Sequence, residues 1–146
     1  MQALEALLRR FAKRANSRWW VGDRPDVRET HMAKAIAERV AYPTAKSDSF
    51  TSGGMIRLSR VQVAHVLAVA GTTSLAYGNA SPSKGKVKEA EQALKNLSDD
   101  AIFLGNGLWE ASAPASWTPL TSATFDCGVI GYDAENAFIF WVEEED

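Results

Sequence analysis

The spacing of apolar residues changes near residue 100, from a helical period to a strand period. Before that point apolar residues recur every three or four positions, which is typical of helices that bury one face. After it, short apolar runs are separated by turn residues, which is typical of strands. The pattern predicts helices over residues 4–15, 27–42, 60–70 and 84–97, and strands over residues 102–104, 108–110, 124–132 and 137–142.

Residues that begin helices support this division. Ser59 and Gln62 have the three-residue spacing of a capping box, in which each side chain satisfies a free backbone N–H of the other. Asp26 and Glu29 have the same spacing before the second helix, and Ser83 precedes the fourth.

The turn signals predict where the chain folds back. Asn106-Gly107 separates the first two strands and is the strongest short signal of a hairpin. Residues 44–54 are rich in Ser, Thr and Gly, and we expect them to form a loop that can act as a hinge.

These elements predict an α+β fold, with a basic N-terminal helical part of about four helices followed by a small antiparallel sheet of about four strands. We expect one domain over residues 1–146. It would contain a helical subregion, residues 1–97, and an acidic β subregion, residues 98–146.

Charge divides the chain at nearly the same place. Residues 1–95 contain all 16 Lys and Arg residues and carry a net charge of +8, whereas residues 96–146 carry −10. The formal net charge of −2 therefore hides two parts of opposite sign. Because a surface of one sign attracts ligands of the other, each part predicts a charged partner.

Composition excludes several classes of protein. The only cysteine is Cys127, so no internal disulfide can form and a reducing compartment fits best. No apolar run approaches the roughly 20 residues that span a membrane. We expect a cytoplasmic protein that does not bind membranes. We expect no cofactor or metal, because no complete catalytic, phosphate-loop or metal-ligand motif is present.

The acidic C-terminal part predicts a surface that docks on a basic protein partner. Opposite charge speeds encounter, while Trp side chains anchor interfaces through their large buried area. We therefore expect a non-catalytic binding protein, of the inhibitor, immunity or anti-defence type that phages and mobile elements carry. The predicted contact residues are Trp109, Trp117, Trp141, Glu143, Glu144 and Glu145.

An alternative function comes from residues 63–80, which resemble the helix-turn-helix of bacterial and phage repressors. The resemblance is carried by Val63-Ala64, Leu67, Val69, Thr72-Thr73, Tyr77 and Asn79. It implies a nucleic-acid-binding regulator whose recognition helix spans residues 72–77. That segment has no Arg, Lys, Asn or Gln to read base edges. The predicted phosphate contacts are Arg57, Arg60, Lys84, Lys86 and Lys88.

A third alternative rests on the segment that contains Arg18, Trp19, Trp20 and Arg24. Arg binds phosphate and Trp stacks on bases, so these residues predict a protein that sequesters a nucleotide-like small molecule. Adjacent residues point in different directions, and we expect one of the two Trp side chains in the core and the other at a surface. A homodimer whose charged parts neutralise each other is a further alternative.

Overall fold

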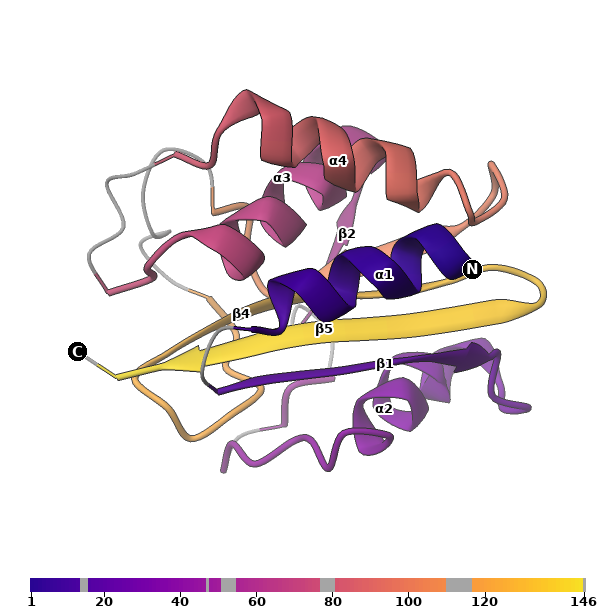
Figure 1. Cartoon of the computed structure of the whole chain (residues 1–146). Helices are drawn as coiled ribbons and strands as arrows, with labels where there is room; N and C mark the ends of the chain where they lie inside the picture. The colour runs from indigo at the N-terminus through magenta and orange to yellow at the C-terminus, as the bar shows by residue number, and fades with distance from the viewer. Residues whose placement is uncertain (14–15, 47, 51–54, 77–80, 110–116, 146) are drawn as a thin grey trace.

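One antiparallel sheet of five strands organises the protein, with strand order β1-β5-β4-β3-β2 (Figure 1). The computed structural model describes residues 1–13, 16–46, 48–50, 55–76, 81–109 and 117–145. The strands are β1 (Ser17–Asp23), β2 (Ile56–Leu58), β3 (Ile102–Gly105), β4 (Phe125–Tyr132) and β5 (Asn136–Glu144). The helices are α1 (Gln2–Phe11), α2 (Glu29–Glu38), α3 (Arg60–Thr72) and α4 (Lys84–Leu94).

Helices cover both faces of this sheet, so the fold has three layers (Figure 1). We call the face under α1, α3 and α4 the three-helix face, and the opposite one the α2 face. Phe138 and Phe140 of β5 point to the three-helix face, where Phe11 packs edge-on against Phe140 at 6.2 Å. Ile139 and Trp141 point to the α2 face, together with Met32 of α2. The alternation along β5 thus places its apolar side chains in two separate cores.

The α+β class is confirmed, and the sheet has five strands instead of the expected four or so. The additional strands, β1 and β2, come from the part of the chain that was expected to be helical. β1 pairs with β5 over its whole length, from Ser17 opposite Val142 to Asp23 opposite Asn136. The basic and acidic parts of the chain are therefore joined in one sheet. β1 shows no polar–apolar alternation, because side chains on both of its faces are half-buried.

The predicted hairpin at Asn106-Gly107 is wrong. β3 pairs with β2 and β4, and residues 108–109 form no strand; residue 110 lies outside the described residues. Asn106 is buried, and its Nδ2 donates a hydrogen bond to Asp126 Oδ1 at 2.8 Å. The Asn-Gly signal predicted a tight turn, but the Asn106 amide instead donates its hydrogen bond to the buried Asp126 carboxylate.

Two of the predicted helix caps are confirmed. Ser59 Oγ accepts from the Gln62 N–H at 3.2 Å, and Gln62 Oε1 accepts from the Ser59 N–H at 2.8 Å. Ser83 caps α4 by accepting from the Lys86 N–H at 3.2 Å. Local hydrogen bonds within one turn are the kind of feature that residue spacing predicts well.

Several helix boundaries differ from expectation: α1 ends at Phe11, α2 at Glu38 and α4 at Leu94, each three or four residues before the predicted end. α2 begins at Glu29, three residues beyond the predicted Asp26 cap. α3 continues through Gly71, where the helix was expected to end. A Cβ on Gly71 would lie 2.3 Å from the Phe11 ring, so this glycine serves the close packing of α1 on α3.

The described part of residues 44–54 is bonded to the segment before β4. The Thr44 N–H donates to Leu120 O at 3.0 Å, and Ser49 Oγ donates to Pro119 O at 2.6 Å. The other residues of this loop include five that lie outside the described ones, and its role as a hinge stays a prediction. Among the described residues, no helix has the length and apolar character that crossing a membrane requires.

Candidate functional site

Two of the three tryptophans predicted to anchor a partner lie in the core. Trp141 is 0% exposed on the α2 face, and Trp109 is 3% exposed on the three-helix side. Neither side chain can contact a partner at the surface, so these two predictions are wrong. Trp117 is half-buried between the Trp109 and Phe125 rings, with centroid distances of 5.3 and 5.5 Å.

A buried carboxylate explains why Trp141 is held inside. Asp126 is 0% exposed, and its Oδ1 accepts from Trp141 Nε1 at 2.9 Å. The backbone N–H groups of Leu120 and Thr121 and the Thr121 hydroxyl donate to the same carboxylate. Burial raises the pKa of Asp126, while these hydrogen bonds act to lower it. The Asp126 carboxylate therefore connects the segments that form the α2-face core. Its only signal in the sequence was its position as a lone acidic residue within the apolar run of β4.

The acidic C-terminal residues are bonded to their own chain. Glu144 accepts hydrogen bonds from the backbone N–H of Leu75 at 2.8 Å and from that of Ala76 at 3.3 Å, just beyond α3. Glu145 accepts from the N–H and hydroxyl of Thr124. These carboxylates hold neighbouring segments to the end of β5, and less of their charge is available to a partner than the sequence predicted.

Glu143 lies on the α2 face, close to the buried Tyr42. Burial and the nearby Glu143 carboxylate both raise the pKa of the Tyr42 hydroxyl, which makes no hydrogen bond within the described residues. Arg18 lies over the Tyr42 ring, 4.5 Å from its centroid, and donates to Val40 O at 3.0 Å. Arg18 therefore fixes the segment after α2, and this contact occupies the guanidinium that was predicted to bind phosphate.

Arg24 likewise has a structural partner. Its guanidinium donates to Glu29 at 2.7 Å and to Asp133 O at 3.1 Å, and it lies over the Tyr132 ring. Tyr132 Oη donates to Glu29 at 2.6 Å. Hydrogen bonds from Tyr132 and Arg24 lower the pKa of Glu29. Burial and the bond to Glu29 raise the pKa of Tyr132 to about 12. These contacts attach the start of α2 to the sheet.

Arg60 caps the C-terminal end of α4. It donates to Leu94 O at 2.9 Å, to Leu97 O at 3.0 Å and to Ser98 O, and it lies over the Phe103 ring. Cationic side chains commonly satisfy the last carbonyl groups of a helix in this way. Arg57, by contrast, is exposed on the short edge strand β2.

Trp19 and Trp20 lie on opposite faces of the sheet, as alternation along a strand requires. Both are half-buried, so the expected division into one core and one surface side chain is wrong. Arg9 lies 5.4 Å from the Trp19 ring centroid, and Arg39 lies 5.1 Å from that of Trp20. The predicted nucleotide pocket is not assembled, because Arg18 contacts Tyr42 instead of either tryptophan.

The helix-turn-helix geometry is absent from the described part of residues 63–80. The motif's first helix is α3, but most of its side chains are buried against the sheet and the other helices. Thr73 is the C-cap of α3, and residues 73–76 form no helix. Residues 77–80 lie outside the described residues.

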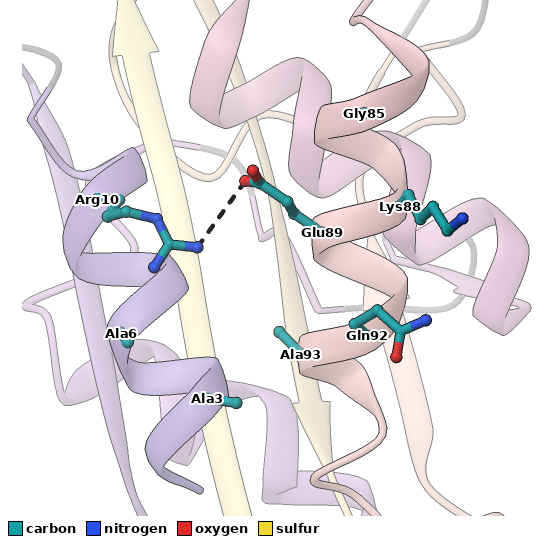
Figure 2. Close-up of a pocket in the computed structure, with 8 residues that line it drawn as sticks. All are labelled: Ala3, Ala6, Arg10, Gly85, Lys88, Glu89, Gln92 and Ala93. Atoms are coloured by element: carbon teal, nitrogen blue, oxygen red, sulfur yellow. Dashed lines mark ion pairs between the residues drawn. The ribbon is translucent and has the colours of Figure 1, made fainter.

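α1 lies beside α4, and the adjoining ends of the two helices both carry exposed cations (Figure 2). The helices are antiparallel: Ala3 faces Ala93, and Arg10 reaches toward Glu89 with an N–O distance of 3.8 Å. The end of α1 therefore lies beside the start of α4. We call the exposed cations of these two ends the basic helix pair; they are Arg9, Arg10, Lys13, Lys84, Lys86 and Lys88.

A shallow groove of about 460 Å³ runs between the two helices (Figure 2). Small side chains line it, namely Ala3, Ala6 and Ala93, together with Gly85. Its polar lining consists of Arg10, Lys88, Glu89 and Gln92. The groove thus has a low apolar floor and cationic side chains near one end.

Few acidic side chains oppose this positive charge. Glu5 pairs with Arg9 at 3.1 Å, and Glu89 is shared by Arg10 and Lys86 at 3.8 and 3.7 Å. The first turn of α4 contains no acidic residue. Its N-terminus also contributes the positive end of the helix dipole. The sequence predicted Lys84, Lys86 and Lys88 as anion ligands, but their proximity to Arg9, Arg10 and Lys13 depends on how the two helices pack.

No group of three His, Cys, Asp or Glu side chains within the described ranges is arranged to hold a metal ion. Comparisons with protein-family models, curated proteins and solved structures found no match for this chain, so the candidate site rests on its geometry and charge alone.

Proposed function

We propose that this protein binds nucleic acid through the basic helix pair, without reading sequence. The observation that carries the proposal is that the end of α1, with Lys13 just after it, and the adjoining start of α4 together carry six exposed cations, although the two helices are more than 70 residues apart in the chain. Phosphate contacts of this kind supply most of the affinity in non-specific binding.

The physical properties of the surface suit a phosphodiester backbone. Within the basic helix pair, Lys13, Lys84 and Lys88 make no ion pair with any described residue, so binding a phosphate would not break an existing salt bridge. The start of α4 adds exposed N–H groups and a positive dipole, which favour anions. The Gln92 amide lines the groove beside Lys88, and the Trp19 ring lies under Arg9. These two groups are too few to read a sequence of bases.

The inhibitor or immunity function expected from the acidic C-terminal part stays a prediction. It has less support, because Glu144 and Glu145 are bonded within the chain and two of its three tryptophans are buried. Of its predicted contacts, Glu145 is exposed and Glu143 is half-exposed at the end of β5.

Fluorescence anisotropy with labelled single-stranded and duplex oligonucleotides of mixed sequence tests the proposal. We expect binding at low salt that weakens steeply between about 50 and 200 mM salt, as counterion release requires. The triple variant Lys13→Glu, Lys84→Glu, Lys88→Glu should weaken binding at least about tenfold and reduce the salt slope by about 3.

A matched variant controls for the change in net charge. Arg28, Lys34 and Lys46 are exposed cations outside the basic helix pair, and their replacement by Glu changes the charge by the same amount. This control should retain most of the binding. If neither nucleic acid binds at low salt, or if both triple variants lose affinity equally, the proposal is wrong.

A further inference from the structure

The outer edge of β1 is open and long. β1 has seven residues, whereas β2 at the opposite edge has three. Proteins usually protect long edges with Pro, Lys, bulges or covering segments, because free N–H and C=O groups there pair with other strands. β1 contains no Pro or Lys, and its register with β5 runs without interruption.

Hydrogen bonds at its two ends show which backbone groups face outward. The Arg24 N–H donates to Glu135 O at 2.9 Å, and the Glu143 N–H donates to Asn16 O at 3.0 Å. Bonded pairs alternate in an antiparallel ladder, so even-numbered residues of β1 bond to β5 and odd-numbered residues point away. No described residue accepts from or donates to the outward backbone groups of Trp19 and Val21.

We propose that a second copy of this chain pairs with this edge, antiparallel, with Trp20 at the two-fold axis. In this register Trp19 and Val21 of each copy exchange hydrogen bonds with the partner's Val21 and the partner's Trp19. Ser17 then lies opposite the partner's Asp23. The pairing thus runs the length of β1, from Ser17 to Asp23, whereas a shift of two residues in either direction would shorten it.

The side chains are complementary in the same register. Trp20 faces the partner's Trp20 in a non-bonded pair, where side chains come closest. The Trp20 ring covers its own Gly22, since a Cβ there would lie 2.5 Å from Cζ2. Two half-exposed indoles would therefore be buried together, which is typical of an interface centre.

Charge supports a second copy as the occupant. Trp19 carries Arg9 over its ring, and the partner's Asp23 would lie diagonally across from Trp19, within reach of that guanidinium. Asp23 is exposed and makes no ion pair with any described residue. Arg18 would face the partner's Gly22, so the two Arg18 guanidinium groups do not oppose each other.

The dimer would also enlarge the basic surface. A two-fold axis perpendicular to the sheet keeps the three-helix face of both copies on one side. Both basic helix pairs would then be presented in the same direction. The proposed pairing of β1 is argued from the open strand edge, and it does not depend on whether nucleic acid binds.

Cysteine cross-linking of the full chain tests the register. In Trp20→Cys, the two Cα atoms would be about 4.5 Å apart, which suits a disulfide. In Trp19→Cys they would be about 8 Å apart, beyond disulfide range. We expect a covalent dimer of the first variant under mild oxidation and none of the second. The native Cys127 is buried and should not contribute.

Sedimentation velocity measures the association without cross-links, with thermal melts to show that each variant folds. The unmodified chain should approach twice the monomer mass as its concentration rises. Asp23→Arg should weaken association roughly tenfold, and adding Arg9→Glu should restore it. Glu91→Arg, the same charge change on an exposed part of α4, should leave association unchanged.

Three outcomes would overturn the inference. They are a monomeric mass at all concentrations, cross-linking of Trp19→Cys instead of Trp20→Cys, and an Asp23→Arg effect that the second substitution does not reverse. A dimer that fails to bind oligonucleotides would contradict the proposed function alone, and a monomer that binds them would contradict the dimer alone.

Discussion

The two faces of the sheet are closed in different ways. Three helices cover the three-helix face, and the side chains at the centre of its core are almost entirely apolar. One helix covers the α2 face, and loop segments around Tyr42 and Leu120 complete that core. The α2 face contains the buried Asp126 and the hydrogen bonds among Arg24, Glu29 and Tyr132.

The difference follows from the backbone. A helix satisfies its own N–H and C=O groups, so helices can close a face with apolar side chains alone. A loop packed on a sheet has N–H groups that need acceptors, and Asp126 supplies one for Leu120 and Thr121. A face closed by loops therefore depends on polar groups whose loss leaves buried donors unpaired.

The largest test of this comparison is Asp126→Ala. It would leave Trp141 Nε1 and the N–H groups of Leu120 and Thr121 buried without an acceptor. We expect the free energy of unfolding to fall by about 5 kcal/mol, or the chain not to fold, because each unpaired buried donor costs about 1–3 kcal/mol. Urea unfolding followed by Trp fluorescence measures the change. Asp126→Asn, which keeps one acceptor oxygen, should cost less.

Leu67→Ala makes the matching change on the three-helix face. Leu67 is fully buried in α3, and its truncation removes apolar contacts without leaving a polar group unpaired. We expect a loss of about 3 kcal/mol by the same measurement. If this loss exceeds that of Asp126→Ala, the polar contacts are not what distinguishes the α2 face.

The smallest expected effect is the pH dependence of the contact between α2 and the sheet. Hydrogen bonds from Tyr132 and Arg24 lower the pKa of Glu29 below its ordinary value of 4.5. The stability that its charged form supplies is present above pH 4.5 and is lost as the pH falls through the lowered pKa of the folded state.

Glu29→Gln should therefore melt at a lower temperature than the native chain near neutral pH, and this difference should shrink on acidification. Glu38→Gln, an exposed glutamate of the same helix, provides the control and should not alter the pH profile. If the difference between the melting temperatures of the native chain and Glu29→Gln instead stays constant down to pH 3, the charge of Glu29 does not stabilise the contact between α2 and the sheet.

Local signals predicted much of the secondary structure. The apolar period located all four helices, and the caps at Ser59 and Ser83 act within one turn of the residues they bond. The strands over residues 124–132 and 137–142 also match β4 and β5 closely. Each of these features depends on residues within a few positions of each other, so their spacing in the chain carries the information.

The candidate site was only partly predictable. Lys84, Lys86 and Lys88 were expected as anion ligands because they are close in sequence. Their grouping with Arg9 and Arg10 arises because α1 packs antiparallel beside α4. Arg18, Arg24 and Arg60 carry the same charge, but each meets carbonyl groups or rings that come from distant segments.

Amino-acid order was enough to set the helices, their caps, the two long C-terminal strands and the separation of charge along the chain. Tertiary structure decided that β1 joins the acidic part of the sheet, that Trp141 and Asp126 are buried together, and which cations remain free. The physical reason is distance along the chain. A turn or cap forms from neighbours, whereas a sheet partner, a buried hydrogen bond or a charged surface exists only after segments far apart have been brought together.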